Sequence, residues 1–120
     1  MSTLKVTNIA GLSGSSTDVM EGLAKAWADL NGTGTPAYQD SYNFSSVTDN
    51  STGNYTMSFT NSMGNANFAP SGVSGETSGT EMWEISTRAT GSFRIDNYKS
   101  DTGSSIDSTL VAMIIHGDLA

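Results

Sequence analysis

The chain has 120 residues, enough for one compact domain with a short extension. Twelve Asp and Glu outweigh five Lys and Arg, and the resulting net charge of −7 argues against nucleic acid or an anionic membrane surface as a partner. The absence of cysteine excludes disulfides, thiolate metal sites and cysteine nucleophiles. No apolar run approaches the length of a membrane span, and the first residues lack the apolar core of a signal peptide, so we expect synthesis in the cytosol and no membrane insertion.

Almost half of the residues are Ser, Thr, Asn or Gly, and only 14% are charged. Thr and aromatic residues favour strands, whereas Gly, Asn and Ser favour tight turns. An apolar fraction of 36%, with two Trp, four Tyr and four Phe, favours a folded β domain over a disordered linker. A small domain without disulfides commonly gains stability by oligomerisation, so we expect contacts between copies.

Residues 1–17 are predicted to form an extended attachment arm and hinge. Leu4, Val6 and Ile9 give the arm an apolar alternation with one change of phase. The sequence GLSGSST over residues 11–17 has the composition of a flexible hinge. We therefore expect the arm to contact other proteins and not to begin the core.

Residues 18–31 are predicted to form a short amphipathic α-helix. Asp18 with Glu21 fits a capping box, and Asn31 followed by Gly32 fits a helix stop. A helix of three to four turns with one apolar stripe needs a partner, either the β domain or copies of itself. The stripe has steps of three and four residues and consists of Val19, Leu23, Ala26 or Trp27, and Leu30.

Residues 36–120 are predicted to form an antiparallel β domain. Tyr38, Asp40, Tyr42 and Phe44 alternate along a first strand, and their side chains are predicted to share one face. Further strands are predicted at 55–60, 68–73, 82–89, 92–98 and 107–116, joined by Gly- and Asn-rich turns that include 49–54. The last strand contains LVAMII, which is apolar on both faces, so we expect it to be central in the sheet or to lie against another subunit. The predicted fold class is mainly β: an antiparallel β-sandwich-like domain preceded by an extended N-terminal arm and one short α-helix.

The residues suited to chemistry form no recognised catalytic pattern. His116 is the only histidine, and no Gly-x-Ser-x-Gly motif is present. Glu81 and Glu84 flank Trp83, but positions three apart on a strand point to opposite faces. We therefore predict no enzyme activity, no catalytic residue, no metal site and no cofactor. Asp49 and Asp101, each in a polar turn, are the carboxylate pair that remains open, because loops can bring distant acids together.

A series of short motifs carries a resemblance to a known class of protein. These motifs follow one another in the order Ala26-Trp27, Asn31–Thr35, Ser45–Asn50, Thr52–Thr56 and Asn65–Phe68. The segment from Trp27 to about Gly72 thereby resembles one that recurs in tail and fibre proteins of tailed phages and prophages. The opening MSTLKVTNIAG is similar to the start of phage fibre-like proteins, which attaches to the particle. Residues 73–120 lie outside the resemblance.

The resemblance implies a virion structural protein, often trimeric and without catalytic residues. We accordingly predict a homotrimer that is made in the bacterial host cytoplasm and located in the virion, with other virion structural proteins as partners. It would be a fibre-like or fibre-base component, and a head- or tail-decorating position stays open. The alternative is a carbohydrate- or receptor-binding adhesion module that contacts a host surface glycan through exposed Tyr, Trp and loop Asn and Asp. The predicted assembly interface consists of Leu4, Val6, Ile9, Val19, Leu23, Trp27 and Leu30.

Overall fold

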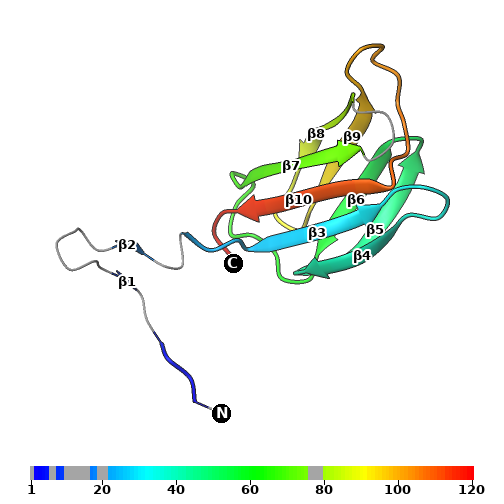
Figure 1. Cartoon of the computed structure of the whole chain (residues 1–120). Helices are drawn as coiled ribbons and strands as arrows, with labels where there is room; N and C mark the ends of the chain where they lie inside the picture. The colour runs from blue at the N-terminus through cyan, green and yellow to red at the C-terminus, as the bar shows by residue number, and fades with distance from the viewer. Residues whose placement is uncertain (1, 6–7, 10–16, 19–21, 76–79) are drawn as a thin grey trace.

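The structure, a computed structural model, describes residues 2–5, 8–9, 17–18, 22–75 and 80–120. Two four-stranded antiparallel sheets pack face to face (Figure 1), which confirms the predicted β-sandwich-like fold. The β3–β10 sheet has the order β4 (Ala37–Tyr42), β3 (Ala26–Asn31), β10 (Leu110–His116) and β7 (Ala69–Gly75). The β6–β9 sheet has the order β5 (Phe44–Ser51), β6 (Asn54–Phe59), β9 (Ser92–Lys99) and β8 (Glu81–Arg88).

The core lies between the two sheets and follows the alternation of side chains along each strand. In β6, Tyr55, Met57 and Phe59 are buried, whereas the intervening Thr56 and Ser58 face outward. Four phenylalanine rings meet at centroid distances of 5.3 to 6.0 Å, and this aromatic cluster packs the β6–β9 sheet against the residue that precedes β7. The cluster consists of Phe44, Phe59, Phe68 and Phe93.

Strand β10 occupies the central position that was predicted for LVAMII. It pairs with β3 on one side and with β7 on the other. Val111, Met113 and Ile115 point into the core, whereas Ile114 lies on the outer face and is 46% exposed. The strand is therefore apolar on both faces although only its inner face is covered by the rest of the described chain.

The helix predicted over residues 18–31 is wrong for its second half. Ala26–Asn31 form strand β3, while residues 19–21 lie outside the described residues. The apolar residues of this segment fit a strand period of two as well as a helical spacing of three and four. Ala26, Ala28 and Leu30 are all buried, and the residues between them face outward. Pairing with both β10 and β4 satisfies the backbone of this segment and outweighs its helix propensity.

The single strand predicted over residues 38–44 is also wrong. Asn43, with a positive φ of 61°, separates β4 from β5, and these two strands belong to different sheets. Its side-chain Nδ2 donates to the carbonyl oxygens of Lys25 and Asn61, which holds the crossing in place. A bulge opposite Asp29 and Leu30 further changes the phase of β4.

The described residues of the predicted arm, 2–5, 8–9 and 17, contribute no strand to the sandwich. Residues 2–5 lie away from the two sheets (Figure 1), and Leu4 is 87% exposed. β1 (Asn8–Ile9) and β2 (Thr17–Asp18) pair with each other as a separate two-stranded sheet. Most of the predicted hinge, residues 11–16, lies outside the described residues.

Candidate interaction surface

The outer face of the β3–β10 sheet carries an uncovered group of large apolar side chains. Trp27 in β3 lies directly opposite Tyr42 in β4 and Ile114 in β10, so these three side chains form a row across neighbouring strands. Val73 in β7 lies opposite Ala112, one row further along the same face. The four larger residues, which we call the apolar strip, are Trp27 (38% exposed), Tyr42 (54%), Val73 (62%) and Ile114 (46%).

Two carboxylates border the apolar strip. Asp29 and Asp40 lie directly opposite each other on β3 and β4, in the row next to Trp27 and Tyr42. Gln39 donates from Nε2 to Asp29 Oδ1 at 3.2 Å, and the backbone N–H of Ser41 donates to Asp40 Oδ1 at 2.8 Å. Like charges that face each other across a ladder repel, so this edge of the strip favours a cationic neighbour.

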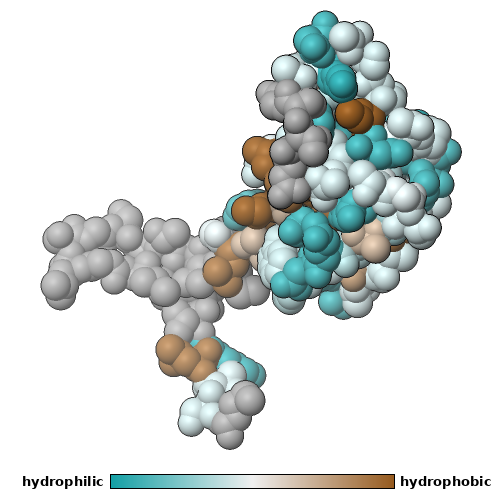
Figure 2. Space-filling view, turned by 45° about the vertical axis from the view of Figure 1, so that its right-hand side comes forward, coloured by the Kyte–Doolittle hydropathy of each residue, from teal (hydrophilic) through white to brown (hydrophobic). Residues whose placement is uncertain are grey.

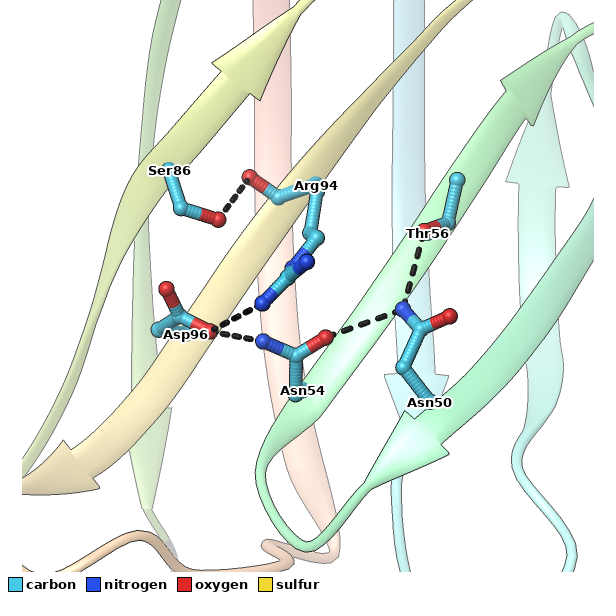
Figure 3. Close-up of polar contacts among 6 residues, drawn as sticks. All are labelled: Asn50, Asn54, Thr56, Ser86, Arg94 and Asp96. Carbon is cyan, nitrogen blue, oxygen red and sulfur yellow. Dashed lines mark hydrogen bonds and ion pairs between the residues drawn. The ribbon is translucent and has the colours of Figure 1, made fainter.

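The outer face of the β6–β9 sheet has the opposite character. Figure 3 shows Asn54 between Asn50 and Asp96, donating to the Asp96 carboxylate while Asn50 Nδ2 donates to Asn54 Oδ1 at 2.9 Å. Asn50 Nδ2 also lies 2.9 Å from Thr56 Oγ1, and Arg94 lies 3.9 Å from Asp96. This face is thus solvated by amides, hydroxyls and charges.

Apolar side chains gather on one flank of the sandwich in Figure 2, near the segment that leads to the arm, while most of the remaining visible surface is hydrophilic or neutral. The sandwich therefore has one face suited to water and one face that retains apolar surface. Soluble monomers rarely leave such apolar patches without a function. The apolar strip is the candidate interaction surface.

The residues predicted from sequence as the assembly interface are distributed over different environments. Leu4 and Leu23 are exposed, at 87% and 53%, and Trp27 belongs to the apolar strip. Leu30 is wholly buried in the core, so its predicted place on an assembly surface is wrong. Ile9 lies in β1, whereas Val6 and Val19 lie outside the described residues.

Two members of the apolar strip, Tyr42 and Val73, have no place in the predicted contacts between subunits. Ile114 belongs to the run LVAMII, for which the sequence predicts a central place in the sheet or a contact with another subunit. The alternation places Tyr42 on the same face as Phe44, and Val73 has no signal beyond its place in a short strand. Their alignment depends on strand order, which the sequence does not reveal.

The residues considered for chemistry are not assembled into one centre. Glu81 faces inward and accepts a hydrogen bond from Ser108 Oγ, whereas Glu84 faces outward and lies 3.4 Å from the Tyr98 hydroxyl, as predicted for opposite faces. His116 is exposed at the end of β10, and Asp49 and Asp101 are also exposed. Over the described ranges, no three His, Asp or Glu gather as metal ligands and no enclosed pocket is present.

A buried polar cluster closes one end of the sandwich. The Tyr55 hydroxyl lies 3.0 Å from the Gly32 carbonyl oxygen and 2.5 Å from Asp107 Oδ1, and it donates to these acceptors. Asp107 Oδ1 also accepts from the backbone N–H of Gly53 at 2.7 Å. Burial raises the pKa of Tyr55 above its usual value, and the hydrogen bond to Asp107 and its negative charge raise it further. These contacts join three loops and have the character of structural support.

Comparison with known proteins adds no relative: no family model, curated protein or solved structure matches the chain. In the part of the chain that the structure describes, no helix has the length and apolar character needed to cross a membrane.

Proposed function

We propose that the protein is a structural component of a tailed-phage particle, fibre-like or belonging to the fibre base. It docks through its N-terminal arm, projects the β-sandwich and works as a homotrimer alongside other virion structural proteins. The observation that carries this proposal is an exposed Leu4, outside a sandwich that has its own core. The motifs between Trp27 and Gly72 supply the particular resemblance to phage tail and fibre proteins.

The chemistry of the surface supports an assembly role. The exposed residues of the apolar strip are suited to contacts, whereas Glu81 and Glu84 point to opposite faces of β8. An assembly role requires apolar area and shape and needs neither a cofactor nor a catalytic residue.

Deletion of residues 1–12 tests the docking role of the arm. We expect the truncated protein to keep the circular dichroism spectrum of the full chain and to unfold cooperatively, because the sandwich begins at Ala26. We also expect it to be missing from purified particles when it replaces the full-length protein during phage production. Leu4→Ser should reduce incorporation, and Thr3→Ser serves as the matched control. Unfolding of the truncated sandwich, or its normal incorporation, would contradict the proposal.

A second candidate function, a carbohydrate- or receptor-binding adhesion module, is favoured by one observation. Trp27 and Tyr42 are exposed aromatic neighbours, and the carboxylates of Asp29 and Asp40 lie in the next row. Aromatic rings beside polar groups can stack on a sugar and hydrogen-bond to it. Titration with host surface polysaccharide would detect this function, with Trp27→Ala weakening binding and Met82→Ala, on the other sheet, leaving it unchanged.

A further inference from the structure

We infer that the apolar strip is the docking site for the N-terminal arm of a second copy of this chain. The contact would be made in trans, with Leu4 and its apolar neighbours on the strip and Lys5 near Asp29 and Asp40. This goes beyond attachment to a particle, because it assigns the arm a second surface within the oligomer.

The strip supplies the apolar half of the contact. Its members lie on all four strands of the β3–β10 sheet, and each is between 38% and 62% exposed within one chain. Burial of such side chains is favourable by about 25 cal/mol for each Å² of apolar surface removed from water. A row of large side chains on a continuous sheet offers a flat surface for an extended segment.

The arm supplies a segment of matching character. Leu4, Val6 and Ile9 provide apolar side chains along residues 1–17. The side chain of Leu4 is 87% exposed, so the described residues of its own chain leave it largely uncovered. The strip and Leu4 are thus both exposed in the same chain, and a second copy can cover each of them.

The charges of the two surfaces are complementary. All 12 Asp and Glu lie after residue 17, whereas Lys5 is the one charged side chain of residues 1–17. Asp29 and Asp40 face each other beside the strip and repel, and an approaching ammonium group would relieve that repulsion. Because the arm carries one positive and no negative side chain, the carboxylates beside the strip attract it.

The aliphatic half of the strip favours a peptide over a glycan. Val73 and Ile114 offer no hydrogen bond to a sugar, but they suit a leucine or isoleucine side chain. An arm on one copy and a strip on the next make a head-to-tail contact, which closes into a ring under cyclic symmetry. A ring of three agrees with the proposed homotrimer.

Mixing of two complementary variants tests docking in trans. One protein lacks residues 2–5 and keeps the strip; the other keeps the arm and carries Ile114→Lys. Each variant alone should have the mass of its own monomer by light scattering at micromolar concentration, whereas the full chain should have three times its monomer mass of 12.5 kDa. The mixture should form a complex of the two variants, because one supplies the arm and the other the strip.

Matched substitutions locate the contact. Trp27→Ser and Tyr42→Ser should each weaken self-association by roughly tenfold or more. Met82→Ser is the control, since Met82 is also apolar and 44% exposed but lies on the β6–β9 sheet. Lys5→Glu and Asp40→Lys should each weaken association, and combining them in one chain should restore much of it. Circular dichroism and melting temperature establish whether each variant is folded. If another strip variant fails to fold, Tyr42→Ser takes its place, because Tyr42 lies on the edge strand β4.

A monomeric full-length chain, or association indifferent to Trp27→Ser and Tyr42→Ser, would overturn the inference, as would failure of the two variants to combine. A monomer that binds polysaccharide through Trp27 would favour the adhesion function instead. Incorporation into particles is measured separately, so a chain that joins the particle without self-association contradicts only this inference. A self-associating chain that never joins a particle contradicts only the proposed function.

Discussion

Tyr55 connects segments that are distant in sequence. Its ring lies in the core between the sheets, while its hydroxyl reaches Gly32 after β3 and Asp107 before β10. A buried hydroxyl without a partner is costly, and here two acceptors from separate loops satisfy it. One side chain thereby fixes the ends of two neighbouring strands in the β3–β10 sheet.

Tyr55→Phe should lower the free energy of unfolding by about 1–3 kcal/mol, because it leaves Asp107 and the Gly32 carbonyl without this donor. Since burial raises the pKa of Tyr55 in the folded state, its contribution is present below the unfolded pKa of about 10 and is lost as the pH rises through the folded pKa. Stability of the wild type should therefore fall above about pH 10. The variant should show a flatter decline. Urea unfolding between pH 7 and 11 measures both effects. Exposed Tyr42→Phe is the control and should change little.

Gly53 and Gly34 allow a comparison of how much stability is lost when a Cβ is added with and without neighbouring atoms close by. Both have positive φ, 69° and 65°, so alanine strains the backbone at either position. A Cβ at Gly53 would also collide with Asn97 O and lie 2.9 Å from Ile106 O, whereas Gly34 has open space around it. We expect Gly34→Ala to cost about 1 kcal/mol and Gly53→Ala clearly more, measured by chemical denaturation. Equal costs would mean that the contacts around Gly53 do not restrict it.

At the scale of elements, β3 illustrates how pairing overrides local preference. The sequence AWADLN is rich in helix formers, and its apolar residues fit a helical stripe as well as a strand. Strands on both sides provide hydrogen bonds along its length, and the core takes Ala26, Ala28 and Leu30. No local feature of the sequence reveals that β10, some 80 residues later, is its neighbour.

Leu30→Ala should destabilise the fold by about 2–5 kcal/mol, because Leu30 is wholly buried in the core. Leu23→Ala is the informative control. A helical stripe would make the two leucines equivalent, but Leu23 is 53% exposed and its replacement should change stability by about 0.5 kcal/mol or less. Thermal unfolding of the two variants checks the difference. Similar losses at both positions would contradict the strand assignment.

The elements from Asn54 onward were easier to predict than those before it, where β5 (Phe44–Ser51) was missed as a strand of its own. Tyr55, Met57 and Phe59 alternate with polar residues, and a Gly-containing turn precedes them, so local pattern and tertiary environment agree in β6. The error at residues 38–44 has a physical cause, since Asn43 tolerates positive φ and allows the chain to change sheets without a glycine or proline. An isolated asparagine in an alternating run gives little warning of such a crossing.

On the scale of the whole molecule, composition and alternation were sufficient for the fold class but not for the interaction surface. A β-sandwich follows from several short strands, each with one apolar side. The apolar strip arises only when Trp27, Tyr42, Val73 and Ile114 are aligned by strands that are not consecutive in the chain. Strand order is set by long-range packing, so the candidate site became visible only in the folded structure.

The central position of β10 also has a consequence for biosynthesis. Among the strands of the described residues it is the last to leave the ribosome, yet it lies between β3 and β7 and completes the sheet. Until it emerges, β3 lacks a partner on one edge, and the chain exposes an unpaired strand next to apolar residues. Folding must therefore await nearly the whole sandwich, and its high contact order favours slow folding. A stalled or truncated nascent chain that ends before Leu110 should aggregate rather than fold in part.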